Sequence, residues 1–347
     1  MNNINNIQKT IAGQSTLGKI TEYDLDWKSI ERGSTHELAM TRDFIFVTGQ
    51  NMHQIAKLNY DGKLLAHWDM PKGSGPHGLV VDQQERLWVS LEFLGKVVRL
   101  DDLGCIVEEV DVRIHTNGAA PINPAPHGIC VGVEKDTIWF TGKRTSTIGK
   151  INADRTVQHF QLDSLGAVPI YLQGGPDGNV WGTELNAGVI LNITPQGTVR
   201  EFRIPTANSR PIGIIPDPMG EFMWFTQEAG RKIGRIDMNG NIAEYPVPTL
   251  QKNHILASLS FDLEMNLWVQ VYIDSNNPLP AGPDYILRFD KSIRGVIGTE
   301  LSGVSYRTFV VPSRDAMLHR IRLGKDGNLW FTEMKTDKIG KVESADS

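Results

Sequence analysis

The chain has 347 residues, of which 40% are hydrophobic and 22% are charged, a composition typical of a soluble globular protein. Its net charge of −5 and singly scattered Lys and Arg residues argue against nucleic acid as a partner. No apolar run approaches the roughly 18 residues of a membrane span, and the polar start, Met1 to Gln14, lacks the apolar core of a signal peptide. With only two cysteines, Cys105 and Cys130, we expect a cytoplasmic protein without a disulfide framework or a membrane partner.

An aromatic residue recurs along the chain at intervals of 42, 51, 42, 43, 44 and 62 residues. The seven anchors are Phe46, Trp88, Trp139, Trp181, Trp224, Trp268 and Trp330. A period of about 40–50 residues built from short strands is typical of a β-propeller. The repeat therefore predicts one closed all-β domain, although length alone would suggest two.

Each repeat contains four short apolar runs separated by turn residues. In the second repeat they are Gly78–Val81, Arg86–Ser90, Val97–Leu100 and Ile106–Val110, which predicts a four-stranded antiparallel blade. The fourth-strand pattern occurs seven times, beginning near Ile20, Leu64, Ile106, Val157, Val199, Ile242 and Tyr306. Because the last repeat ends after its third strand, at Val342, we expect the N-terminal strand to complete the last of seven blades. The predicted organisation is a flexible segment 1–18, a propeller over 19–343 and a tail 344–347.

The repeated anchors are interpreted as packing residues between neighbouring blades. The hydroxyl residue two positions after the anchor is likewise interpreted as a repeated strand or turn contact; these residues are Thr48, Ser90, Thr141, Thr183, Thr226 and Thr332. Function is expected where the repeat departs from its own pattern.

Two positions per blade are expected at the same end of the central channel, which we call the mouth, because antiparallel strands begin and end there. The position that begins the first strand carries His36, His77, His127, Ile170, Ile212, Ala257 and His319. The position that ends the second strand carries Gly49, Leu91, Gly142, Glu184, Gln227, Val271 and Glu333. Histidines can transfer protons near neutral pH, and carboxylates can act as bases or hold a hard cation.

His319 and Glu333 are the preferred functional pair, because one blade supplies both. We assign His36, His77, His127, Glu184 and Gln227 to substrate binding. The alternative for His77 and His127, which lie in repeated Pro-His-Gly motifs, is that each ring only hydrogen-bonds a neighbouring backbone group.

Three insertions interrupt the repeat. Those around His115–Pro126 and Asp274–Asp284 are expected at the mouth, where they can wall a pocket. The third, near Ser292–Val304, is expected on the opposite face and is given no role.

The motifs Pro-His-Gly-(Ile/Leu), Leu-Trp-Phe-Thr-Glu and Lys-Ile-Gly-(Lys/Arg)-(Ile/Val) resemble the virginiamycin B lyase (streptogramin B lyase) family. The resemblance runs from about Ile20 to Val342 and is strongest from His319 onward. Enzymes of that family open a cyclic depsipeptide antibiotic by elimination at an ester, using a magnesium ion. The resemblance implies that Glu333 helps to hold Mg²⁺ and that His319 transfers the proton, while His36 stands where the family carries a tyrosine.

Two positions depart from the family pattern. Met317 stands where the family has a second carboxylate, and Ala257 corresponds to a further family histidine; Asp315 and His254 lie nearby in the sequence. Magnesium bound by one protein carboxylate and several waters is chemically acceptable.

The expected function is therefore a magnesium-dependent carbon–oxygen lyase that acts as a monomer on a small cyclic peptide or ester. One alternative is a metal-dependent lactonase or other hydrolase on the same fold, in which the cation activates water. The other is a non-catalytic propeller that binds a ligand or a protein.

Overall fold

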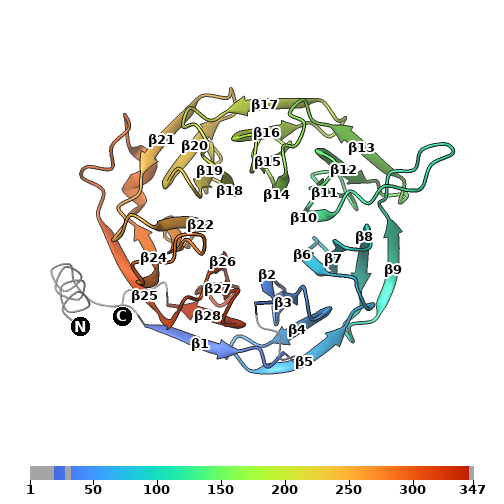
Figure 1. Ribbon diagram of the computed structural model, residues 1–347, viewed down its shortest axis with the longest axis horizontal. Coiled ribbons are helices and arrows are strands. Elements are labelled where there is room, and N and C mark those ends of the chain that lie inside the picture. The colour runs from blue at the N-terminus through green and yellow to red at the C-terminus, as the bar shows by residue number, and fades with distance from the viewer. Residues whose placement is uncertain (1–18, 28–32, 344–347) are drawn as a thin grey trace.

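The protein is a ring of seven blades around a central axis (Figure 1). This computed structural model describes residues 19–27 and 33–343, and each blade is a four-stranded antiparallel sheet. The predicted all-β, seven-bladed fold is confirmed. The N-terminal segment 1–18 and the tail 344–347 lie outside the described residues. No helix in the described part is long and apolar enough to cross a bilayer.

The strands of each blade follow one another from the axis to the rim (Figure 1). The innermost strands are β2 (Thr35–Met40), β6 (Pro76–Val81), β10 (Pro126–Val131), β14 (Pro169–Gly174), β18 (Pro211–Pro216), β22 (His254–Phe261) and β26 (Leu318–Leu323). The second strands are β3 (Ile45–Gly49), β7 (Leu87–Leu91), β11 (Ile138–Gly142), β15 (Val180–Glu184), β19 (Phe222–Gln227), β23 (Leu267–Ile273) and β27 (Leu329–Glu333). The third strands are β4 (Gln54–Leu58), β8 (Lys96–Leu100), β12 (Thr147–Ile151), β16 (Val189–Ile193), β20 (Lys232–Asp237), β24 (Pro283–Phe289) and β28 (Lys338–Val342). The outermost strands are β5 (Leu64–Asp69), β9 (Ile106–Asp111), β13 (Val157–Gln161), β17 (Val199–Arg203), β21 (Ile242–Pro246), β25 (Tyr306–Arg314) and β1 (Ile20–Asp24).

The N-terminal strand closes the ring, as predicted. β1 pairs antiparallel with β28, with Ile20 opposite Val342, so the seventh blade combines both ends of the chain. Asp337, in the turn before β28, strengthens this closure. Its carboxylate accepts hydrogen bonds from the backbone N–H groups of Gly33, Ser34 and Thr35 at 2.9, 2.8 and 3.1 Å, and so ties the seventh blade to the start of the first.

The anchor tryptophans are packing residues, as expected. Trp88, Trp181, Trp224, Trp268 and Trp330 are completely buried between blades. Each indole N–H donates to an aspartate of the preceding turn, as in the bond of 2.9 Å from Trp88 to Asp82 and that of 2.8 Å from Trp268 to Asp262. The anchors thus combine a large buried apolar area with a satisfied polar atom, which explains why this residue type recurs.

The repeated hydroxyl groups connect one blade to the next. The hydroxyls of Thr48, Ser90 and Thr332 donate to the backbone carbonyls of His77, His127 and His36, at 2.9, 3.2 and 2.7 Å. In each case the acceptor begins the innermost strand of the following blade. These hydroxyls are therefore structural, and they also fix the backbone positions of three mouth histidines.

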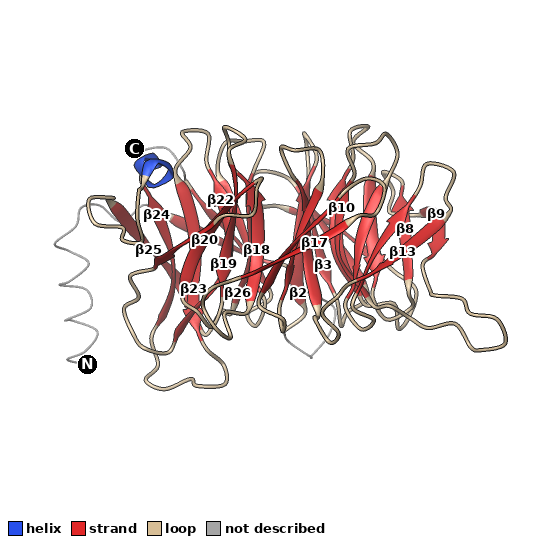
Figure 2. Ribbon diagram, turned by 90° about the horizontal axis from the view of Figure 1, so that it is seen from above, coloured by secondary structure: helices blue, strands red, loops and turns tan. Residues whose placement is uncertain are grey.

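The insertions lie on two faces of the ring. The connection from β9 to β10 contains an isolated bridge between Ile114 and Ile122, and it projects from the face opposite the short helix η1 (Lys291–Gly295) (Figure 2). The extended connection from β23 to β24 joins a second to a third strand, so it lies on the mouth face as well. The η1 segment joins a third to a fourth strand and therefore lies on the opposite face.

We predict that Asp337→Ala destabilises the propeller by about 1–3 kcal/mol, because three buried or half-buried N–H donors lose their acceptor. Urea unfolding followed by tryptophan fluorescence measures this loss. The matched control is Asp43→Ala, since Asp43 is exposed and its ion pair is with its neighbour Arg42. Equal stability of the two variants would contradict a role for Asp337 in ring closure.

Candidate active site at the mouth of the propeller

Four histidines from four successive blades of the ring come together at the mouth. The ring centroid of His36 lies 5.0 Å from that of His77 and 5.1 Å from that of His319. The His77 and His127 centroids are 3.6 Å apart. The structure thus brings together all four histidines that the sequence predicted at this end of the innermost strands.

A break in strand pairing places each of these histidines. The register between first and second strands shifts between Pro76 and Leu79 in the second blade, and between Leu318 and Ile321 in the seventh. The same shift occurs in all seven blades, and it releases the intervening residues from regular pairing. Bulged residues of this kind can direct side chains out of the sheet pattern.

The rings of His77 and His127 each use one nitrogen for a neighbouring backbone group. His77 Nδ1 lies 3.2 Å from the carbonyl oxygen of His127, and His127 Nδ1 lies 3.1 Å from that of Ile170. A carbonyl can only accept, so Nδ1 carries the proton in both rings and Nε2 keeps its lone pair. The backbone contact expected as the alternative role is therefore present, but it leaves the second nitrogen available.

Three of the clustered histidines are held in the neutral form. Burial lowers the pKa of His36 well below its usual value, and the nearby His319 and His127 lower it further. Burial and the neighbouring His36 do the same for His77, and burial and His77 do so for His127. At neutral pH these rings are neutral donors and acceptors rather than cations.

A buried charged layer lies one residue further along the innermost strands. The Arg320 guanidinium donates from Nε to Glu37 at 2.7 Å and from a terminal nitrogen at 2.5 Å, while Ser258 accepts another of its N–H groups at 3.1 Å. Its central carbon also lies 3.8 Å from the ring centroid of Tyr171, a residue of the fourth blade. Arg320 therefore bridges the central axis beneath the histidines.

Glu37 also touches the preferred catalytic histidine. Its carboxylate oxygen is 3.3 Å from His319 Nε2, a close contact that lacks the geometry of a hydrogen bond. Burial opposes ionisation of Glu37, but Arg320 and His319 outweigh burial and hold the pKa of Glu37 well below its usual range. An ionised carboxylate therefore stands beside the His319 ring, which is 21% exposed.

The polar residues at the ends of the second strands make their contacts away from the histidine cluster. The Glu333 carboxylate accepts a hydrogen bond from Thr336 at 2.6 Å and is adjacent to Glu22 of the outermost strand β1. Gln227 donates to Glu244 of β21 at 2.7 Å, and Glu184 interacts with Glu201 of β17. These three side chains thus contact the rim of their own blades, and no contact between described residues joins Glu333 to His319.

Two buried carboxyl groups of this set hold protons unusually tightly. Burial and the nearby Glu22 raise the pKa of Glu333 to about 7, although Thr336 offsets part of this. Burial, Glu201 and Asp163 raise the pKa of Glu184 to about 8. The Glu333 Oε1 atom is buried and has no hydrogen-bond partner among the described residues, so it is available to a cation.

Two groups of side chains in the described part of the chain have ligand atoms close enough to hold a metal ion. The ligand atoms of His36, His77 and His319 lie within 4.8 Å of one another, as do those of His77, Glu92 and His127. In the second group the carboxylate is already occupied. Gln50 donates to Glu92 at 2.7 Å and the Lys143 ammonium lies 3.2 Å from it.

At the two departures from the family pattern, Ala257 and Met317, the groups at and near these positions make structural contacts. The ring nitrogens of His254 contact the Gln251 N–H at 3.0 Å and the Pro283 carbonyl at 3.1 Å, so this ring does not replace a histidine at the position of Ala257. The Met317 N–H donates to the buried carboxylate of Asp284 at 3.1 Å. Asp284 thereby fixes the chain just before His319.

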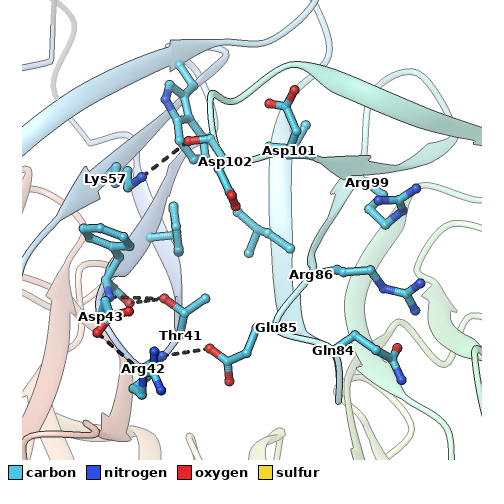
Figure 3. A pocket seen from close by; sticks show the side chains of 15 residues that line it. Thr41, Arg42, Asp43, Lys57, Gln84, Glu85, Arg86, Arg99, Asp101 and Asp102 are labelled. Carbon is cyan, nitrogen blue, oxygen red and sulfur yellow. Dashed lines mark hydrogen bonds and ion pairs between the residues drawn. The ribbon is translucent and has the colours of Figure 1, made fainter.

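A separate groove of about 700 Å³ lies on the opposite face, between the first and second blades (Figure 3). Lys57 lies in it, 4.0 Å from the Phe44 ring centroid, and Glu85 accepts from the Arg42 N–H at 2.8 Å. The groove contains none of the site residues predicted from the sequence. Its Arg86 and Arg99 side chains are paired with Asp82 and Glu108, which do not line the groove, and we place the candidate site at the mouth, where the four histidines gather.

The charged layer was not anticipated from the sequence, although a signal for it exists. The residue after the mouth position is glycine in three blades, at Gly78, Gly128 and Gly213. In the other four blades it is Glu37, Tyr171, Ser258 or Arg320, the same four residues that contact one another across the axis. The exceptions to the repeat therefore extend to the residue that follows the mouth position.

The fold and this site define the class of protein: a seven-bladed β-propeller that gathers neutral histidines over a buried ion pair at one end of its axis. The model of the Virginiamycin B lyase family matches residues 109–277. A virginiamycin B lyase of Nocardia farcinica (strain IFM 10152) is 29% identical over 213 residues, which are 50% of this chain and 70% of that protein.

Solved structures agree over almost the whole chain. A streptogramin B lyase structure matches with a TM-score of 0.77 at 25% identity, covering 94% of this chain and 97% of that one. A catalytically inactive histidine-to-alanine variant of virginiamycin B lyase from Staphylococcus aureus, solved with Quinupristin, has a TM-score of 0.75 at 26% identity, covering 94% and 99%. The resemblance of this chain to the virginiamycin B lyase family is confirmed.

We predict that Glu37→Gln destabilises the protein by about 3–5 kcal/mol, because it leaves the buried Arg320 charge unpaired. The double variant Glu37→Gln with Arg320→Leu should lose less free energy of unfolding than the sum of the losses in the two single variants. Urea unfolding measures all three. The control is Asp315→Asn, which breaks an exposed pair with Lys335 and should cost less than about 1 kcal/mol. A loss for Glu37→Gln as small as the control would contradict the structural role of the pair.

We predict that Glu184→Gln becomes progressively more stable than the wild type as the pH rises from 5 to 8. With a folded-state pKa of about 8 against an ordinary value of 4.5, Glu184 stays protonated in the folded chain but ionises in the unfolded chain. Its contribution to stability therefore falls with pH in this window, by up to about 1.4 kcal/mol per pH unit. Denaturant unfolding at pH 5, 6.5 and 8 tests this, with the exposed Glu300→Gln as control. A stability difference that does not change with pH would contradict it.

Proposed function

We propose that the protein is a lyase that opens a cyclic depsipeptide of the streptogramin B type at its ester bond by elimination, with the help of Mg²⁺. The observation that carries this proposal is the position of His319 at the mouth, in a chain whose fold and sequence resemble virginiamycin B lyases. The inactive histidine variant of the S. aureus relative, solved with Quinupristin, supports a catalytic histidine and a substrate of this kind.

His319 is the proposed acid–base group. In the elimination it takes the proton from the carbon next to a carbonyl; the electron pair of that C–H bond forms a carbon–carbon double bond, and the C–O bond of the ester breaks to release a carboxylate. The ionised Glu37 beside Nε2 favours a proton on that nitrogen and stabilises the imidazolium that forms. Arg320 holds Glu37 in place, so the pair orients the base.

The other mouth histidines are the proposed substrate-binding groups. His36 and His77 are neutral, and each has a buried ring nitrogen without a hydrogen-bond partner among the described residues. Such nitrogens can accept from the amide N–H groups of a cyclic peptide. Glu184 and Gln227 are secondary candidates for this role, because their side chains interact with Glu201 and Glu244 of the outermost strands.

Glu333 is the proposed protein ligand of Mg²⁺. Its partnerless Oε1 and the adjacent Glu22 carboxylate supply the oxygen donors that this ion prefers. The Lys338 ammonium, 3.0 Å from Glu22, already balances part of their charge, and burial is the main cause of the raised pKa of Glu333. When bound, Mg²⁺ polarises the carbonyl group and stabilises negative charge that develops on its oxygen.

A cytoplasmic location and a monomeric state complete the proposal. Both cysteines are free, Cys105 on the surface and Cys130 in the core, which suits a reducing compartment. The strands β1 and β28 pair within one blade, so the described part of the ring leaves no incomplete sheet for a second copy to fill.

The decisive assay is incubation of the full chain with a type B streptogramin, with and without Mg²⁺, followed by mass spectrometry. We expect ring opening without a change in mass and without oxygen from labelled water. His319→Ala should lower the rate by about 10²–10⁴-fold, and Glu333→Gln should raise the Mg²⁺ concentration needed. The control is Glu300→Gln, which alters an exposed residue.

Two outcomes would overturn this function. Incorporation of solvent oxygen would identify a hydrolase, and no ring opening under conditions where a known lyase is active would exclude this substrate class.

A further inference from the structure

We propose that His36, His77 and His319 form a binding site for a divalent transition-metal ion such as Zn²⁺ or Co²⁺. The three residues lie on the innermost strands of the first, second and seventh blades, which are neighbours in the closed ring (Figure 1). Their ligand atoms all lie within 4.8 Å of one another, so small ring rotations can bring them to one ion. This inference goes beyond the proposed function and does not depend on it.

The surroundings of the rings already resemble the outer sphere of a metal site. A histidine that binds a metal commonly donates its other ring N–H to a carbonyl or carboxylate. His77 Nδ1 contacts the His127 carbonyl at 3.2 Å, and its buried Nε2 has no hydrogen-bond partner in the described part of the chain. His319 has the Glu37 carboxylate 3.3 Å from Nε2, which leaves Nδ1 as its ligand atom. One nitrogen of the His77 ring is thus oriented and the other is available, and the His36 ring also has a buried nitrogen without a partner among the described residues, Nδ1.

The charge state of the cluster favours a cation. Burial and the neighbouring histidines hold His36 and His77 neutral, so no proton has to leave a ring before a metal ion binds. Buried nitrogens without partners, at His36 Nδ1 and His77 Nε2, cost free energy that coordination would remove. The ionised Glu37 adds a negative charge next to the site.

The ligand type selects the class of ion. Imidazole nitrogens suit Zn²⁺, Co²⁺, Ni²⁺ and Cu²⁺, whereas Mg²⁺ prefers oxygen. Three histidines with an open fourth position are a common ligand set for zinc. The neighbouring group of His77, Glu92 and His127 is less suited, because the Lys143 ammonium lies 3.2 Å from Glu92. His319 belongs both to this metal site and to the proposed active site. An ion bound to its ring would therefore prevent it from transferring a proton.

The test uses the full chain after chelator treatment, titrated with Co²⁺ and followed by visible absorption, with Zn²⁺ affinity obtained by competition against a chromophoric chelator. We expect one equivalent of Co²⁺ to bind with the spectrum of nitrogen ligation, and millimolar Mg²⁺ not to displace it. His77→Ala should weaken Zn²⁺ binding by at least about tenfold. His115→Ala, which removes an exposed histidine outside the cluster, should leave the affinity unchanged.

Two results would overturn the site. One is that the wild-type protein binds Co²⁺ no more tightly than the His36→Gln, His77→Ala double variant does. The other is that the His77→Ala variant binds the metal with the same affinity as the wild type. If His77→Ala does not give the circular dichroism of the folded chain, His36→Gln replaces it in the same comparison. Lyase activity is measured separately. Ring opening without Co²⁺ binding overturns this inference alone, whereas Co²⁺ binding without ring opening supports it and overturns only the proposed function.

Discussion

The hydrogen bond between a repeated hydroxyl and the next blade is the contact on which the mouth depends. Thr332, Thr48 and Ser90 each donate to the backbone carbonyl of a mouth histidine one blade ahead. The same hydroxyl accepts from the bulged backbone of its own blade, as Thr48 does from the Glu37 N–H at 3.0 Å. One side chain therefore fixes both the bulge and the spacing between blades. The rings of the histidines are positioned because their backbone is held from two sides.

A second constraint acts across the axis. In four blades a larger polar residue replaces the glycine that the other three blades carry after the mouth position. These residues are Glu37, Tyr171, Ser258 and Arg320. At Gly78 and Gly128 a Cβ atom would come within 2.4 Å of the next blade's carbonyl oxygen, so glycine is required there by close approach of two backbones. Where the blades leave room, larger polar side chains fill the axis. Their ion pair beneath the histidines couples stability to the orientation of His319.

The oxygen and nitrogen atoms that we propose as metal ligands lie in different parts of the protein. The oxygen donors, Glu333 and Glu22, contact one another toward the rim of the seventh blade, whereas the nitrogen donors gather near the axis. Met317 and Ala257 stand where the resemblance would lead one to expect a carboxylate and a histidine, while His36 stands where the family carries a tyrosine. The mouth is therefore poorer in oxygen donors than the family pattern, which favours borderline metals over hard ones.

The sequence by itself determined the seven blades, the starts of the outermost strands and the four histidines at one end. These follow from local alternation and a regular period, because each blade is a unit whose strands are consecutive in the chain. Only the tertiary structure decided which side chains meet across the axis or toward the rim. Arg320 reaches Glu37, 283 positions away, because the ring closes. It reaches Tyr171 because Tyr171 stands on the far side of the axis. Glu333 meets Glu22 because the N-terminal strand completes the last blade, and no local pattern encodes such distant pairs.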